Sequence, residues 1–117
     1  MLPQKHRLRH ASDFKQIRQL GEGKRHPLII LLFKASTQPD SRFAFVASKR
    51  VGNAVVRNRA KRLIRESVHT LLEQIQPGWD CVFIARARIN NSKFSEVETA
   101  VNQLLMRAEL LTQGGDI

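Results

Sequence analysis

The segment from Ser48 to Ser67, SKRVGNAVVRNRAKRLIRES, combines seven Lys or Arg residues with apolar residues at helical spacing. On a helix, one side would gather the residues able to pack on a sheet, and most charges would fall on the other side. We therefore predict an amphipathic helix from about Ala54 to Ile75, with Asn53 as its cap and Pro77-Gly78 beyond its end. Its core-facing residues are Val56, Ala60, Leu63, Ile64, Ser67, Val68 and Leu71.

The opposite side of this helix carries like charges. Arg57, Lys61 and Arg65 form one line, and such pairs destabilise an isolated helix by roughly 0.2–0.5 kcal/mol each. A solvated face usually intersperses Glu, yet no acid precedes Glu66 in the segment. Phosphate binding explains the pattern better, because an Arg fork bonds two phosphate oxygens at once. The predicted phosphate-binding residues are Lys49, Arg50, Asn53, Arg57, Asn58, Arg59, Lys61, Arg62 and Arg65.

Apolar patterning elsewhere predicts two further helices. The first lies within residues 11–23, with Ser12 as its cap, an apolar side formed by Phe14, Ile17 and Leu20, and a left-handed stop at Gly21. The last helix begins near Ser95, where Ser95 and Glu98 have the spacing of a capping box. Its apolar stripe comprises Val97, Val101, Leu104, Leu105 and Ala108.

Three strands are expected between these helices. Residues 26–35 and 42–48 are separated by the turn-prone STQPDS, and we predict that they pair as an antiparallel hairpin. The third strand covers WDCVFIARA, residues 79–87. The order α-β-β-α-β-α indicates a small α+β domain with helices packed on a three- to four-stranded sheet. One domain over residues 1–117 is expected, with residues 1–8 and 112–117 flexible.

The charge balance points to a polyanionic partner. The formal net charge is +10 at a sequence pI near 11.1, and nucleic acid or an anionic membrane offsets such a charge. The single Cys81 is expected to be a small core residue in a reducing cytoplasm. We expect no membrane, since the longest apolar run, Leu28–Phe33, is too short to span a bilayer and the stripe of the basic helix is needed to cover the sheet. The chain also shows no helix-turn-helix and no zinc-ligand cluster, which disfavours DNA.

No catalytic centre is recognisable. The ten acids are spread thinly, and the four histidines His6, His10, His26 and His69 are scattered. Nucleases use clustered carboxylates for metal ions or paired histidines for proton transfer. We therefore predict no catalytic and no metal-binding residue in this chain, and chemistry supplied by a partner.

The stretch SKRVGNAVVRNRAKRLIRE resembles the protein subunit of bacterial ribonuclease P. The likeness extends to RLRHASDFKQI, to GKR after the first helix and to FIARAR, and covers roughly residues 5–110. The resemblance implies a ribonucleoprotein enzyme that hydrolytically removes the 5′ leader of precursor tRNA. It implies that a catalytic RNA holds the Mg²⁺ ions, and that the phosphate-binding residues of the basic helix and its loop are RNA-binding residues that meet this RNA. It also implies that the fold contains a left-handed βαβ crossover.

The resemblance also implies a cleft beside the first helix that holds the single-stranded leader. Family members often carry two aromatics one turn apart on that helix, whereas here Phe14 is followed by Arg18. Phe14, Phe43 and Phe45 are candidates to stack on bases, and each is also a candidate for ordinary core packing. Arg18 is expected to contact a phosphate or to stack on a base.

Two other functions stay open at this point. A ribosomal or general RNA-binding protein would suit the charge but not the full motif. A stand-alone protein nuclease would cleave precursor tRNA without any RNA subunit.

Overall fold

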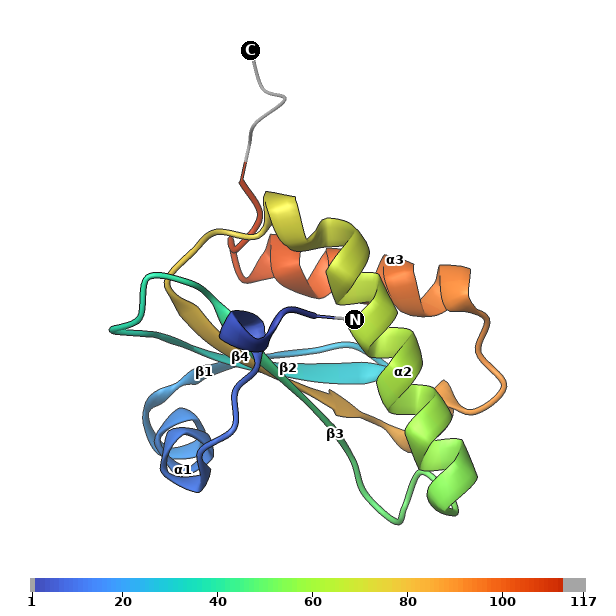
Figure 1. Cartoon of the computed structure of the whole chain (residues 1–117). Coiled ribbons are helices and arrows are strands. Elements are labelled where there is room, and N and C mark those ends of the chain that lie inside the picture. The colour runs from blue at the N-terminus through green and yellow to red at the C-terminus, as the bar shows by residue number, and fades with distance from the viewer. Residues whose placement is uncertain (1, 113–117) are drawn as a thin grey trace.

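Four strands form one mixed sheet in the computed structural model, which describes residues 2–112 (Figure 1). The strands are β1 (Glu22–Arg25), β2 (Ile29–Ala35), β3 (Arg42–Ala47) and β4 (Trp79–Ala85). The α-helices are α1 (Ala11–Leu20), α2 (Ala54–Leu71) and α3 (Phe94–Arg107), and short 3-10 turns are η1 (Gln4–His6), η2 (Leu72–Gln74) and η3 (Ala87–Ile89). The predicted α+β class is confirmed. The strand β1 was not predicted, because EGKR has no apolar pattern.

The strand order is β1-β2-β4-β3, so β4 lies between β2 and β3. β2 pairs antiparallel with β1 and β4, whereas β3 pairs parallel with β4. The predicted hairpin between the second and third strands is therefore wrong. A short turn favours a hairpin, but the alternation of side chains fits either neighbour, and β4 enters from much later in the chain. The left-handed sense of the β3-α2-β4 crossover stays a prediction.

Helices cover the two faces of the sheet unequally. α2 and α3 lie on one side and α1 on the other (Figure 1). Phe43 of β3 and Phe83 of β4 face the main core, into which α2 and α3 pack their apolar stripes. Ala44 and Val82 face the opposite way and form a smaller core with Leu8 and Ile17. This alternation puts successive β3 side chains on opposite faces.

α1 is anchored mainly by one side chain. Ile17 is its only buried residue, and Leu20, expected on its apolar side, is 71% exposed. Ser12 lies inside the helix rather than capping it, and Gly21 is extended (φ −85°) rather than left-handed. Gly21 is needed for space instead, since a Cβ there would lie 2.5 Å from the Ile17 carbonyl oxygen and 2.7 Å from that of Phe33.

The other two helices begin and end close to their predicted positions. α2 ends at Leu71 and continues as η2, short of the predicted Ile75. The predicted α2 stripe is buried, with Val56 partly buried. α3 begins one residue before Ser95, and the predicted Ser95–Glu98 capping box is wrong. Glu96 accepts the bond instead, from the Lys93 backbone N–H at 2.9 Å.

The amino-terminal residues are packed against the sheet. Leu2 and Leu8 are buried, and the Leu8 N–H donates to the Phe43 carbonyl oxygen at 2.9 Å. His6 Nδ1 lies 2.7 Å from the Ser41 carbonyl oxygen. Two buried apolar side chains thus attach residues 2–8 to the sheet, and the flexibility expected for residues 1–8 stays a prediction. Most of the predicted flexible tail, residues 113–117, lies outside the described residues.

Candidate nucleic-acid interface

α2 presents its cations on the side opposite to its buried stripe. The basic face of α2 comprises Arg57, Asn58, Arg59, Lys61, Arg62 and Arg65. Asn53 caps the helix as predicted, with its side-chain oxygen accepting from the Val56 N–H at 3.0 Å. The helix is thereby fixed at its start by the cap and along its length by the core.

The cations of the basic face have no acidic partner within residues 2–112. The ion pairs of that range involve Lys5 with Asp40, and Arg42 with Asp13 and Asp80. Arg59 donates to the Ser92 carbonyl oxygen at 2.8 Å, and the buried Nε of Arg57 has no hydrogen-bond partner there. Positive charge is therefore left for an external anion, as the repulsion between like charges on this helix predicts.

The β3–α2 loop adds two more cations beside the start of α2. Lys49 and Arg50 are exposed, and the loop is braced by buried Val51, whose carbonyl oxygen accepts from Asn90 Nδ2 at 2.5 Å. Gly52 has φ +152°, and a Cβ there would lie 2.9 Å from a Val56 methyl carbon. The loop therefore needs glycine to bring the chain close to the start of α2.

An open cleft of about 940 Å³ runs from α1 past β3 to α2. The predicted leader residues Phe14, Phe43 and Phe45 line it. Phe43 is only 2% exposed and belongs chiefly to the core, whereas Phe14 and Phe45 are half-buried. Arg18 is exposed and is not among the lining residues. Arg18 therefore does not line this cleft, although it follows Phe14 by one turn of α1.

The cleft and the basic face share side chains. Lys61, Arg62 and Arg65 line the cleft and also a shallow hollow of about 550 Å³ on the outside of α2. The Arg65 guanidinium carbon lies 5.5 Å from the Phe45 ring centre, and Phe45 stacks on Phe83 at 5.9 Å. The basic face of α2 and the aromatic cleft, which the sequence predicts as separate surfaces, are thus one continuous surface.

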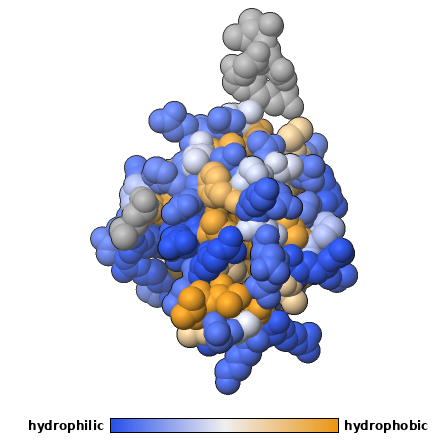
Figure 2. Space-filling view, turned by 90° about the vertical axis from the view of Figure 1, so that its right-hand side faces the viewer, coloured by the Kyte–Doolittle hydropathy of each residue, from blue (hydrophilic) through white to orange (hydrophobic). Residues whose placement is uncertain are grey.

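Sequence reasoning missed several residues of the cleft. The additional cationic or polar lining residues include Arg7, Arg9, His69 and Thr70. The basic residues at the start of the chain are evident in the sequence. Because that segment was expected to be flexible, it could not be assigned to a wall of the cleft. Figure 2 shows hydrophilic surface surrounding several hydrophobic patches on the face it presents, and exposed Val55 borders the hollow on α2.

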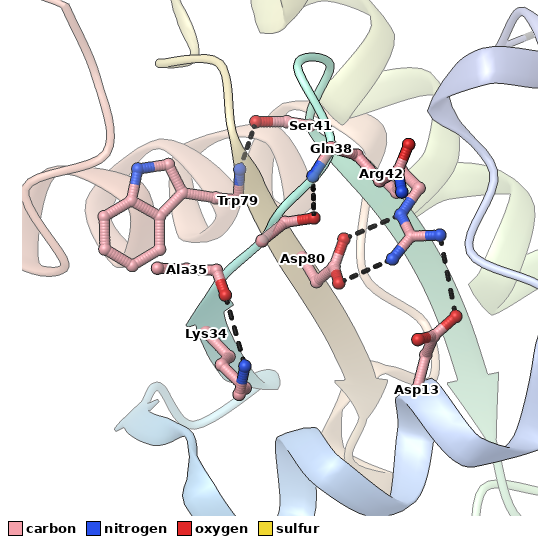
Figure 3. A network of polar contacts seen from close by, with 9 residues as sticks. Asp13, Lys34, Ala35, Gln38, Ser41, Arg42, Trp79 and Asp80 are labelled. Atoms are coloured by element: carbon pink, nitrogen blue, oxygen red, sulfur yellow. Dashed lines mark hydrogen bonds and ion pairs between the residues drawn. The ribbon is translucent and has the colours of Figure 1, made fainter.

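A polar network ties α1 to the strands beside the cleft (Figure 3). Arg42 donates two hydrogen bonds to Asp80, at 2.9 and 2.8 Å, and lies 3.5 Å from Asp13 of α1. The hydrogen bond to Asp80 raises the pKa of Arg42 above its usual value. Asp13 immediately precedes Phe14, so the network helps to fix the aromatic wall of the cleft.

The remaining reactive groups offer no catalytic arrangement within residues 2–112. Cys81 is fully buried, and burial raises the pKa of its thiol far above the usual range, which keeps it protonated and inert. No three His, Cys, Asp or Glu side chains of that range are grouped so that they could hold a metal ion. Over the same residues, every helix is too short or too polar to cross a bilayer.

Comparison with known proteins gives a consistent family. The family model described as Ribonuclease P matches residues 2–109. A protein named ribonuclease P protein component from Herpetosiphon aurantiacus is 38% identical over 104 residues, covering 89% of this chain and 85% of its own. One of the same name from Dehalococcoides mccartyi is 39% identical over 112 residues, covering 96% and 92%.

The fold gives the same result. The structure of the ribonuclease P protein from Thermotoga maritima superposes with a TM-score of 0.79 at 30% identity, covering 86% of this chain and 96% of that one. The ribonuclease P protein from Staphylococcus aureus superposes with a TM-score of 0.79 at 26% identity, covering 95% and 96%. With the motif, the fold and the basic face of α2 in agreement, this chain belongs to the ribonuclease P protein family.

Proposed function

We propose that this chain is the protein component of ribonuclease P, and that it assists removal of the 5′ leader from precursor tRNA. One observation carries the proposal: the cations of α2 lack acidic partners among the described residues and continue without a break into a cleft with aromatic walls. A folded RNA can bind the cations of α2, and an unpaired RNA strand can bind in the cleft with aromatic walls.

The basic face and the β3–α2 loop bind the catalytic RNA in this proposal. Lys49 and Arg50 stand at the start of α2, and Arg57, Lys61 and Arg65 continue along it. Arg side chains position a protein on phosphates without reading sequence. Neutralising phosphates in this way lets RNA segments approach each other, so the bound RNA folds more tightly.

The cleft holds the leader of the precursor tRNA. Phe14 and Phe45 are partly exposed within it, which is what stacking on an unpaired base requires. Arg65 covers Phe45 in the free protein. Its planar guanidinium can stack on a base in the same place or move to a phosphate.

The hydrolysis itself belongs to the RNA subunit. When bound to that RNA, Mg²⁺ would supply an activated water and would stabilise charge on the leaving oxygen. The carboxylates of residues 2–112 do not form a group able to hold such an ion, so we assign Mg²⁺ to the RNA. What this chain's residues do is bind the RNA, hold the leader and lower the repulsion between the two.

The partners follow from this role: a catalytic ribonuclease P RNA and precursor tRNA, with neither DNA nor a membrane. A cytoplasmic location fits a protein whose single cysteine, Cys81, is buried as a free thiol. A general RNA-binding protein would copurify with many RNAs, whereas this proposal expects one RNA that is not ribosomal.

Reconstitution tests the function directly. The protein should raise the rate of 5′ leader removal by a bacterial ribonuclease P RNA at low Mg²⁺. Protein freed of all RNA should show no cleavage, and cleavage by such protein would establish a stand-alone nuclease instead. No stimulation of any bacterial ribonuclease P RNA would overturn the proposal.

The role of α2 has its own measurement. Replacing Arg57, Lys61 and Arg65 by Ala should weaken assembly with the catalytic RNA. It should also flatten the salt dependence of binding by about one unit of slope for each phosphate that the protein no longer neutralises. An unchanged slope in a filter-binding titration would remove α2 as the contact surface.

A further inference from the structure

A second group of cations lies at the turn between β1 and β2. Arg107, at the end of α3, donates to the Arg25 carbonyl oxygen at 2.7 Å. Arg86, just after β4, donates to the His26 carbonyl oxygen at 3.3 Å. Because these two carbonyls are consecutive in the chain, two guanidinium groups from distant segments gather on one turn. We call Arg25, His26, Arg86 and Arg107 the turn cluster.

The turn cluster has no acidic partner in the described part of the chain. None of its members forms an ion pair within residues 2–112. Burial, followed by the positive charge of Arg107, lowers the pKa of His26 below its usual value. His26 Nδ1 accepts a hydrogen bond from the Leu28 N–H at 3.0 Å, which fits a neutral ring. The positive charge of the site comes from its three arginines, which have no acidic partner within residues 2–112.

The arginines retain the means to bind an anion. Arg86 and Arg107 each have five N–H donors and spend one on a backbone carbonyl, and both side chains are exposed, as is Arg25. The backbone bonds hold the two groups in place and reduce the entropy lost on binding. No residue of the turn cluster lines the cleft or the hollow on α2.

We propose that the turn cluster is a second phosphate-binding site, at which Arg86 and Arg107 grip the backbone of an RNA. This inference rests on the proposed function, because the RNAs that it involves are large enough to contact two separate surfaces of the protein. The phosphates come from either the catalytic RNA or the precursor tRNA, and both present the same phosphodiester oxygens to an Arg fork.

Salt-dependent binding tests the site. The variant carries Arg86→Ala and Arg107→Ala, and the matched control carries Lys5→Ala and Lys34→Ala, which remove the same charge outside the cluster. Binding to the catalytic RNA and to precursor tRNA is titrated separately. The cluster variant should lose about two units of salt slope with one of these RNAs, and the control should lose none. The RNA that shows the loss is the source of the phosphates.

A third variant separates charge from geometry and guards against misfolding. Arg86→Lys with Arg107→Lys keeps both charges but loses the fork, and it should recover most of the slope while binding less tightly than the wild type. Equal slopes for wild type and cluster variant with both RNAs would overturn the inference alone. Failure of the wild-type protein to bind either RNA would overturn the proposed function as well.

Discussion

Arg42 and Asp80 are register partners on the parallel strands β3 and β4, and two hydrogen bonds of 2.9 and 2.8 Å join their side chains. The Arg42 side chain is 18% exposed and that of Asp80 is 10% exposed. Asp13 reaches the same guanidinium from α1. One arginine therefore joins the two strands and holds the helix that forms a wall of the cleft.

Loss of the Asp80 carboxylate should be costly. Asp80→Asn leaves the largely buried Arg42 without its closest counter-charge, and we expect a loss of about 3 kcal/mol in the free energy of unfolding. Urea denaturation measures it. Asp13→Asn, which leaves the Arg42–Asp80 pair intact, should cost less than half as much. Equal losses for the two variants would show that Arg42 does not depend mainly on Asp80.

The aromatic residues of the cleft should separate into binding and core roles. Phe14→Leu keeps an apolar side chain in the small core but removes the stacking surface, so affinity for precursor tRNA should fall by about 1–3 kcal/mol. Affinity for mature tRNA, which has no leader, should not change. Phe43→Leu should instead lower the free energy of unfolding by about 1 kcal/mol or more, because Phe43 is buried. If Phe43→Leu instead lowered the affinity for precursor tRNA and Phe14→Leu lowered only the stability, Phe43 would be the stacking residue.

Asn53 offers a way to separate helix stability from RNA affinity. Asn53→Ala removes the cap of α2 and should cost about 1 kcal/mol of stability. Asn53→Asp keeps the acceptor for the Val56 N–H and should preserve stability, but its negative charge beside the phosphate-binding loop should weaken RNA binding. Asn53→Ser, a neutral cap, is the control. Thermal unfolding measures the stability, and filter binding measures the RNA affinity. Tighter RNA binding by Asn53→Asp would contradict the placement of RNA phosphates beside the start of α2.

The buried Cys81 predicts a dependence of stability on alkaline pH. Burial raises the pKa of its thiol in the folded state, so folding favours the protonated form. Its contribution is complete below the pKa of the unfolded thiol, about 8.5, and is lost above it by about 1.4 kcal/mol per pH unit. The chain has no Tyr to obscure this range. Cys81→Ala should remove the slope between about pH 8.5 and 10, and persistence of the slope would assign it elsewhere.

The sequence was sufficient for the elements that carry strong periodicity. α2 was predicted with its cap and buried stripe because Val56, Ala60 and Ile64 repeat at helical spacing beside a cap residue. The basic face followed from the same geometry. Its lack of acidic partners within residues 2–112 agrees with the argument from repulsion.

Pairing between distant segments was beyond sequence reasoning. Nothing in RFAFVA distinguishes a parallel neighbour from an antiparallel one, and the charged strand β1 is an edge that buries little. The cleft was incomplete for the same reason, since Leu2 and Arg7 reach it only after the start of the chain packs on β3. The turn cluster likewise assembles from three segments that are far apart in sequence.

The parallel pairing of β3 with β4 has a consequence for synthesis of the protein. The basic helix is encoded between these strands, and its apolar side is not fully covered until β4 and α3 have left the ribosome. A nascent chain that ends near Gln76 carries every Lys and Arg of this helix but lacks β4 and α3, which complete the core beneath it. Productive capture of the RNA subunit should therefore follow release of the finished polypeptide.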